Sequence, residues 1–270
     1  MRDIAFRTNG RVHGFIRRLV SPSDLGERLK PFVFLDEVSG EVTPGTGFGF
    51  HPHSGIATLT YHLDADVQYE DTSGQKGKVK ATGLEWMRAG SGTWHKGTMH
   101  PHGKTTVGFQ LWVALGPDLE VGPAEGIYVS PDDVPQIDNV RLLLGEYGGA
   151  RSLIPSPSPM MYADVTLAAG ARWELRPAPG QSVAWAHVYR GRVRTGGELV
   201  ERTLVGFTES EGELVFEAET DARFLVGTAK KHEHPLVLGN SSVHTSAAAL
   251  ERGLSGIRSV GEDLARAGRM

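Results

Sequence analysis

The sequence of 270 residues contains no cysteine. Without cysteine there can be no disulfide framework, no thiolate metal site and no cysteine nucleophile. A metal ion would have to be held by histidine, aspartate or glutamate, and the chain has 11 histidines and 32 acidic residues. The composition therefore still allows a metal site with nitrogen and oxygen ligands.

The sequence also lacks a concentrated positive charge and a long apolar run. Its 28 lysines and arginines are dispersed and the formal net charge is -4, which argues against direct binding to nucleic acid. No segment approaches the roughly 18 apolar residues of a membrane span, and residues 1–7 lack the apolar run of a secretory signal. We therefore expect a cytoplasmic protein that does not bind a membrane.

Helical stretches are few, and strand-like runs dominate. Short runs rich in β-branched and aromatic residues are separated by 35 glycines and 15 prolines, a pattern typical of sandwiches and barrels rather than βαβ folds. Only residues 246–252 and 261–267 have a helical pattern. The sequence therefore predicts an all-β protein with a short helical segment near its carboxyl end.

A proline-rich segment near the middle indicates a domain boundary. Four prolines break the chain between residues 117 and 136, after which strand-like runs resume. We therefore expect two β-domains, residues 1–135 and residues 136–270. A weak internal repeat, a strand followed by a tight turn and a second strand in each half, supports this division. The repeat does not include the histidine motif described next, so we assign any metal chemistry to the first domain.

Two histidines with one residue between them, His51 and His53, form the most informative motif. Side chains in a strand alternate between faces, so both imidazoles would point to the same side. Neutral imidazole nitrogen binds zinc, copper, iron and nickel. A third histidine, His95, follows a glycine-rich turn and could reach the same face from a neighbouring antiparallel strand.

The spacing around these histidines resembles the two motifs of the cupin superfamily. Gly45 is followed after five residues by His51 and then by His53, as in the opening of the first motif. Gly92 is followed after two residues by His95, as at the end of the second. The two matches occur in the expected order.

Further segments narrow the resemblance to the pirin family of bicupins. In the first half these are residues 31–37 (PFVFLDE), 47–53 (GFGFHPH), 85–92 (EWMRAGSG) and 109–113 (FQLWV), and in the second half residues 145–149 (GEYGG) and 234–237 (HPLV). The likeness covers nearly the whole chain. It implies two cupin barrels in tandem, each a jelly-roll-like double-stranded β-helix.

The resemblance also implies one divalent transition metal in the amino-terminal barrel, usually iron, held by three histidines and one glutamate. By position the histidines are His51, His53 and His95, whereas the glutamate position holds Gly97. The carboxyl-terminal barrel has no metal motif. We expect iron(II), with nickel, copper, manganese or zinc as alternatives, and a centre whose positive charge the protein compensates less than usual.

Strand alternation gives no substitute for the missing carboxylate. If one strand continued from His53, residues 55, 57, 59 and 61 would share the face of the histidines. Ala57 also occupies the glutamate position of the general cupin motif. His62 would point to the opposite face, toward solvent.

Three interpretations of the centre remain open. In the first, the three histidines hold the metal and water completes its coordination. In the second, His100 folds back as a fourth ligand, although Pro101 and Gly103 indicate a loop around His100 and His102. In the third, the metal site has been lost and the histidines make ordinary hydrogen bonds.

Charged residues near His95 are further candidates for binding or proton transfer. These are Glu85, Arg88 and Lys96, each of which we expect to be a solvated or paired surface charge unless it orients a substrate. The adjacent Asp36 and Glu37 are predicted to make structural hydrogen bonds at the end of a strand. The three histidines are predicted metal ligands, and no residue is assigned a catalytic role.

Two classes of function follow from the resemblance. The first is a metal-dependent dioxygenase of the quercetinase type, acting on an aromatic or enolic small molecule. The missing glutamate weighs against simple transfer of this activity, because that residue can act as the base for the substrate hydroxyl. The alternative is a non-catalytic regulatory protein, a transcriptional co-regulator or a modulator of a metabolic enzyme, that acts through a protein partner.

Overall fold

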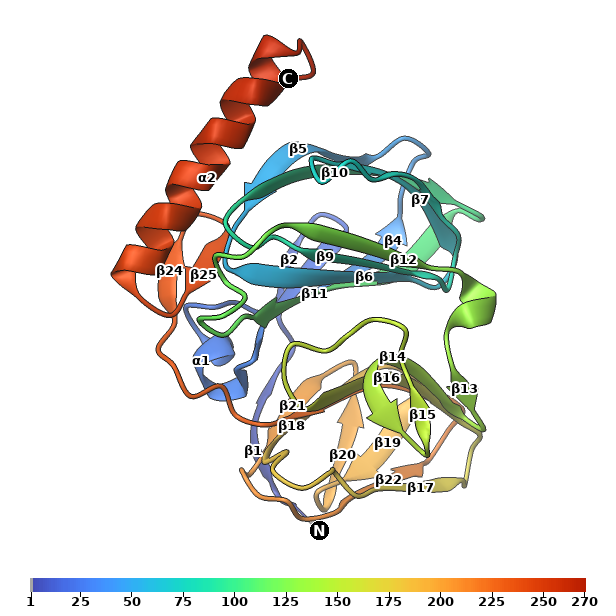
Figure 1. The fold of residues 1–270 in the computed structure, drawn as a ribbon. Helices are drawn as coiled ribbons and strands as arrows, with labels where there is room; N and C mark the ends of the chain where they lie inside the picture. Colours follow the sequence, from blue (N-terminus) through green and yellow to red (C-terminus); the bar gives the residue numbers. More distant parts are fainter. Residues whose placement is uncertain (1) are drawn as a thin grey trace. The chain divides into compact units, whose positions relative to one another are not determined.

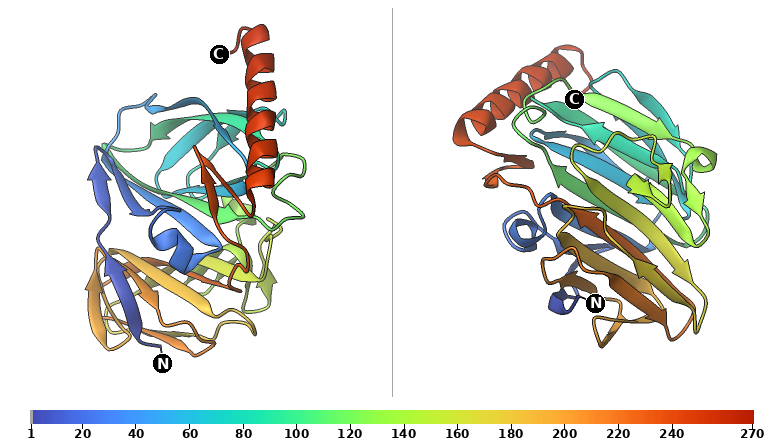
Figure 2. Two further views of the ribbon diagram at one scale, coloured as in Figure 1. Left: turned by 90° about the vertical axis from the view of Figure 1, so that its left-hand side faces the viewer. Right: turned by 60° about the horizontal axis from the view of Figure 1, so that its bottom comes forward.

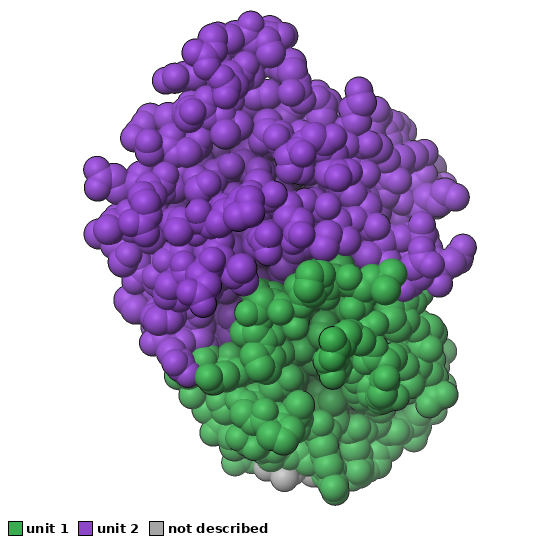
Figure 3. Space-filling model, viewed as in Figure 1, with its two compact units in different colours: residues 1–11, 134–231 green, residues 12–133, 232–270 purple. Residues whose placement is uncertain are grey.

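Two compact units make up the fold of this computed structural model, which describes residues 2–270. One unit comprises Met1–Arg11 and Val134–Lys231, and the other comprises Val12–Asp133 and His232–Met270 (Figure 3). Antiparallel strands dominate both units, and α2, near the carboxyl end, is the only long helix among the described residues (Figure 1). The prediction of an all-β protein is confirmed.

The metal motifs lie in the unit built from Val12–Asp133 and His232–Met270, which we call the histidine unit. Its first sheet has the strand order β12-β9-β6-β11-β4-β3-β2. The strands, in chain order, are β2 (Arg11–His13), β3 (Ile16–Val20), β4 (Phe32–Glu41), β6 (Ile56–His62), β9 (Leu84–Arg88), β11 (Thr105–Ala114) and β12 (Glu125–Val129).

A second sheet of the histidine unit has the order β5-β10-β7-β8 (Figure 1). Its strands are β5 (Gly47–His53), β7 (Ala65–Asp71), β8 (Lys76–Val79) and β10 (Thr93–Pro101). A two-stranded sheet, β24 (Val237–Gly239) and β25 (Ser242–His244), completes the strands. The helices are α1 (Leu25–Leu29), the 3₁₀ turn η1 (Pro131–Asp133) and α2 (Ala247–Arg266).

The other unit, the apolar unit, contains an eight-stranded and a four-stranded sheet. The larger has the order β1-β21-β18-β23-β16-β14-β13, with β15 paired to β14, and the smaller has the order β17-β22-β19-β20. Their strands are β1 (Ile4–Thr8), β13 (Gln136–Ile137), β14 (Val140–Tyr147), β15 (Ala150–Arg151), β16 (Met160–Leu167), β17 (Arg172–Leu175), β18 (Val183–Arg190), β19 (Arg192–Thr195), β20 (Glu198–Glu201), β21 (Leu204–Phe207), β22 (Leu214–Ala218) and β23 (Ala222–Ala229).

The interior of the apolar unit is filled by side chains. Trp173, Phe216 and Phe224 lie at its centre, with Phe216 and Phe224 stacked at a ring separation of 4.7 Å. Aliphatic residues from both sheets surround these rings. Small barrels are stabilised by such packing, because buried aromatic side chains remove a large apolar area from water.

Each end of the chain belongs to the unit that is formed mainly by the other half of the sequence. Strand β1 pairs with β21 in the apolar unit, with Ile4 opposite Phe207 and Thr8 opposite Leu204. Residues 232–270 belong instead to the histidine unit. The units therefore differ from a simple division of the chain into two consecutive halves, and the pairing of β1 with β21, about 200 residues apart, leaves no local signal in the sequence.

Helix α2 is one continuous helix of 20 residues rather than two separate helical segments. Two glycines between the predicted helical segments are sites of close approach. A Cβ at Gly256 would lie 2.0 Å from the carbonyl oxygen of Ser91, and one at Gly253 would lie 2.4 Å from Nε2 of His244. The helix therefore packs tightly against β24, β25 and β10 (Figure 2). No helix within residues 2–270 has both the length and the apolar character needed to cross a membrane.

Candidate metal centre

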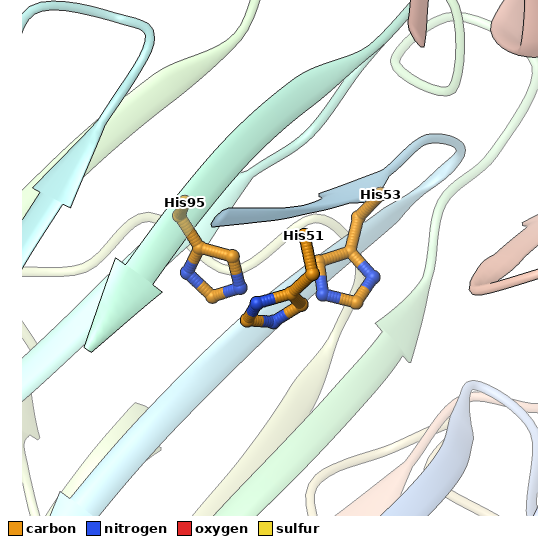
Figure 4. Close-up of side chains that lie close together, drawn as sticks. All are labelled: His51, His53 and His95. Carbon is orange, nitrogen blue, oxygen red and sulfur yellow. The ribbon is translucent and has the colours of Figure 1, made fainter. Parts of the chain in front are cut away.

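The three predicted histidines come together on two paired strands of the smaller sheet. Strands β5 and β10 are antiparallel, with His51 directly opposite His95 and His53 opposite Thr93. One potential ligand nitrogen from each histidine lies within 4.8 Å of the other two (Figure 4). Among residues 2–270 this is the only such group of His, Cys, Asp or Glu side chains.

The hydrogen bonds of the histidine rings direct their Nε2 atoms inward. Nδ1 of His51 donates to the carbonyl oxygen of Gly49 at 2.8 Å, and Nδ1 of His53 donates to that of Ser241 at 2.9 Å. Such contacts set the tautomer of a metal-binding imidazole and leave the lone pair of Nε2 free. Nε2 of His95 is buried and has no hydrogen-bond partner within the described chain. These atoms suit a divalent transition metal.

Burial keeps the imidazoles of His51 and His53 neutral. It lowers the pKa of His51 and lowers that of His53 well below the usual range, and the neighbouring ring of His95 adds to both effects. Only a neutral imidazole offers a lone pair to a metal, so these shifts favour metal binding over protonation near neutral pH.

Neither expected carboxylate position contributes to the centre. Gly97 lies two residues beyond His95 and faces the same cavity. A Cβ at this position would lie 3.5 Å from Cγ1 of Val67, which is ordinary contact, so the backbone does not require glycine here. Ala57 is buried in β6, which belongs to the opposite sheet.

The assumption of one continuous strand beyond His53 is wrong. Gly55 has a φ of 73°, so the chain turns there and passes from one sheet to the other. On β6 the cavity is therefore lined by Thr60 and His62 rather than by the odd-numbered residues. The expectation that His62 is solvated is also wrong, because this side chain is buried.

The burial of His62 makes the metal-free protein sensitive to acid. Burial lowers the pKa of His62 from 6.5 to about 4. The unfolded chain therefore binds a proton below pH 6.5 that the folded protein takes up only near pH 4, and stability falls across this interval as the pH is lowered. We expect His62→Gln to flatten the pH dependence of the melting temperature between pH 6.5 and 4. Equal slopes for both proteins would contradict this.

His100 is not a fourth ligand. It lies within strand β10 rather than in a loop, and the alternation of side chains places it on the face opposite His95. His102 lies beyond the strand, and its Nε2 is 2.9 Å from Oδ1 of Asp66. The interpretation in which His100 folds back is therefore contradicted.

A cavity of about 680 Å³ adjoins the three histidines within the histidine unit. The larger sheet presents a polar row toward it, formed by neighbours in register on five strands: Glu85, Thr60, Gln110, Asp36 and Arg18. The Thr60 hydroxyl donates to Oε1 of Gln110 at 2.9 Å, and the guanidinium of Arg18 donates to the Asp36 carboxylate. Burial raises the pKa of Asp36 although Arg18 opposes the effect.

Gln110 offers an unused donor to the cavity. Its Nε2 is buried without a hydrogen-bond partner within the described chain. Beside it, the rings of Phe34 and Trp112 stack at 4.1 Å, and Trp112 lies 4.9 Å from the ring of His53. Gln110 was not predicted from the sequence to belong to the site, although it is the single polar side chain in the run from Val107 to Val113.

The charged residues near His95 lie in different environments. Arg88 pairs with Glu125 at 3.4 Å and Lys96 pairs with Glu70 at 2.9 Å, as expected of paired charges. Glu85, in contrast, is only 5% exposed and lines the cavity, so the prediction of a surface charge is wrong for it. Asp36 lies inside β4, not at a strand end.

Comparison with known proteins agrees with this geometry. The Pirin family model matches residues 14–113. A pirin-like protein of Caulobacter vibrioides is 33% identical over 225 residues, covering 74% of this chain and 73% of its own. A quercetin 2,3-dioxygenase structure from Acinetobacter baumannii has a TM-score of 0.88 at 26% identity and covers 96% of this chain and 97% of its own.

The nickel(II) complex of the Escherichia coli pirin YhhW shares the fold, with a TM-score of 0.66 at 19% identity, covering 86% of this chain and 98% of its own. Like the Acinetobacter structure, it matches both units along most of the chain. The predicted tandem of cupin barrels is confirmed.

Proposed function

The chain belongs to the pirin family, and on this premise we propose that it is a metal-dependent dioxygenase of the quercetinase type. One observation carries the proposal: three imidazoles converge beside a cavity large enough for a small aromatic molecule. Ligand pockets in proteins usually have volumes of about 300–1,000 Å³. The similarity to the Acinetobacter quercetin 2,3-dioxygenase indicates the class of reaction.

His51, His53 and His95 would hold the metal through Nε2. Iron(II) is the expected metal. Nickel, copper and zinc are alternatives that also bind well to imidazole, and manganese, which prefers oxygen ligands, is a further alternative. A bound metal would polarise an enolate or catecholate oxygen of the substrate and support the chemistry of dioxygen. The carbonyl oxygens of Gly49 and Ser241 hold two of the rings in the orientation this requires.

The cavity side chains would bind a planar substrate that carries oxygen atoms. The stacked Phe34 and Trp112 supply a flat apolar surface, and Nε2 of Gln110 can donate to a carbonyl or hydroxyl oxygen. The absence of a side chain at Gly97 leaves room beside the histidines. A hydroxylated aromatic compound or an enol meets these requirements.

Turnover of a flavonol tests the proposal. The purified protein is loaded separately with iron(II), nickel, copper or manganese, and quercetin absorbance is followed under oxygen. We expect the absorbance to fall with at least one metal and to stay constant for the metal-free protein. Constant absorbance with all four metals would reject this substrate. A stoichiometric protein partner isolated in place of turnover would favour a regulatory role.

Gln110→Leu tests the binding mode. This change removes the free donor and leaves the Thr60 hydroxyl without its acceptor, so we expect flavonol to bind about tenfold more weakly, from the roughly 1.4 kcal/mol typical of one hydrogen bond. Gln110→Glu is the matched variant, since it keeps an acceptor for Thr60 but loses the donor. Binding is measured by fluorescence without oxygen. Wild-type affinity in both variants would exclude a role for Gln110.

A further inference from the structure

A buried carboxylate faces the histidines from the opposite sheet. Glu85 lies on β9, in the larger sheet, whereas His95 lies on β10, in the smaller one. Oε1 of Glu85 is 3.7 Å from Nδ1 of His95, and the two side chains are only 7% and 9% exposed. The contact therefore spans the barrel interior beside the proposed metal.

Glu85 has no positively charged partner that would explain its burial. Arg88 of the same strand pairs with Glu125. Within residues 2–270, His95 is the only basic side chain within 4.0 Å of the Glu85 carboxylate. An ionised carboxylate is costly to bury unless a positive charge lies nearby. A metal dication on the far side of the His95 ring would supply that charge.

The position of Glu85 completes a pattern shared by the three histidines. Nδ1 of His51 donates to the carbonyl oxygen of Gly49 and that of His53 to the carbonyl oxygen of Ser241, whereas Nδ1 of His95 lies 3.7 Å from Oε1 of Glu85, the distance of an ion pair rather than of a hydrogen bond. Each oxygen favours a proton on Nδ1 and a lone pair on Nε2. Only the oxygen that faces His95 belongs to an acidic side chain.

We propose that Glu85 is a positioning residue that acts on the metal through His95 and offsets the absence of a carboxylate at position 97. Its negative charge, 3.7 Å from Nδ1 of His95, favours the tautomer with the proton on Nδ1 and so makes Nε2 a stronger ligand. The negative charge thus stays near the centre without occupying a coordination position. The inference rests on the metal site of the proposed function, but not on turnover.

The affinity for metal tests this role independently of catalysis. Dissociation constants for iron(II) and cobalt(II) are measured without oxygen by competition with a chelator. We expect Glu85→Gln, which keeps the shape but removes the charge, to weaken binding by about 10–100-fold and to shift the visible absorption bands of bound cobalt(II). Glu85→Asp, which keeps the charge, should recover part of the affinity.

Two further variants separate a local effect from a general one. Glu125→Gln removes the same charge from the neighbouring strand β12 and should leave metal affinity within about twofold of wild type, as expected of an exposed ion pair. Gly97→Glu, placed in the Glu85→Gln protein, restores a carboxylate at a position with room for it and should restore binding. Melting temperatures of the metal-free variants monitor folding.

The outcomes distinguish this inference from the proposed function. Wild-type affinity in Glu85→Gln, or no metal binding by the wild-type protein, would overturn the role of Glu85. A metal-loaded crystal structure with a Glu85 oxygen bonded directly to the metal would also overturn it. If Glu85→Gln weakens metal binding while no flavonol is turned over, the inference stands and the proposed function fails.

Discussion

His53→Ala is expected to weaken metal binding on the order of a hundredfold or more and to abolish metal-dependent turnover. The binding energy of a structural zinc site, about 10–16 kcal/mol shared among its ligands, corresponds to roughly 3 kcal/mol for each. His53 should show the largest effect of the three because it is the most buried, at 3% exposed. Its ring is also fixed on both sides, by the Ser241 carbonyl and by Trp112.

His100→Ala is the matched control for this experiment. It removes an imidazole from the same sheet, but from the face of β10 that points away from the cavity. Metal content is measured by elemental analysis and affinity by titration. Loss of binding in His53→Ala with full retention in His100→Ala is the expected pair of results. Retention in both would contradict the three-histidine site.

The arrangement of His51, His53 and His95 was predictable because each histidine lies in a short motif that can be recognised from its neighbours in the sequence. The alternation of a strand puts two of them on one face, and a neighbouring antiparallel strand supplies the third. The family resemblance supplied the order of the motifs and the tandem of barrels. The same alternation failed beyond His53, since the turn at Gly55 moves the chain to another sheet and resets which residues face inward.

Residues on the larger sheet could not be assigned to the site from sequence. Glu85 is ten positions from His95 and would face the same way only if both belonged to one strand. Their contact depends instead on two sheets facing each other. Gln110 is a polar residue within an apolar run. That pattern predicts that its side chain is buried, but not that it lines this cavity. The sequence thus predicted the residues on the histidine-bearing sheet better than those that line the cavity from the larger sheet.

The carboxyl-terminal segment also escaped prediction, although it contacts the metal site directly. The carbonyl oxygen of Ser241 accepts the hydrogen bond from His53. Ser54 directly follows β5, and its Oγ lies 2.9 Å from Nε2 of His244. The segment therefore acts as a support for one metal-binding ring. Its position depends on a buried network around Glu120 that nothing in the local sequence indicates.

Glu120→Ala is expected to destabilise this support by about 3 kcal/mol. The carboxylate of Glu120 is 2% exposed and accepts three hydrogen bonds: from Nδ1 of His244 at 3.0 Å, from the Thr245 backbone at 2.7 Å and from the Thr245 hydroxyl at 2.5 Å. Removing it leaves the buried Nδ1 of His244 and two partly buried donors of Thr245 unpaired, at a cost of about 1–3 kcal/mol for each unsatisfied buried group before relaxation. Water that enters the site would pair with some of these donors and so lower the total loss of stability.

Hydrogen exchange and metal affinity together test this prediction. We expect faster exchange of the amides in β24, β25 and α2 in Glu120→Ala, a lower melting temperature and weaker metal binding, because the Ser241 carbonyl no longer holds the His53 ring. Glu27→Ala is the control, since it removes an exposed partner of Lys30 and should change stability by less than about 1 kcal/mol. Unchanged exchange in the carboxyl-terminal segment would show that Glu120 does not anchor it. Faster exchange with unchanged metal affinity would show that the segment does not position His53.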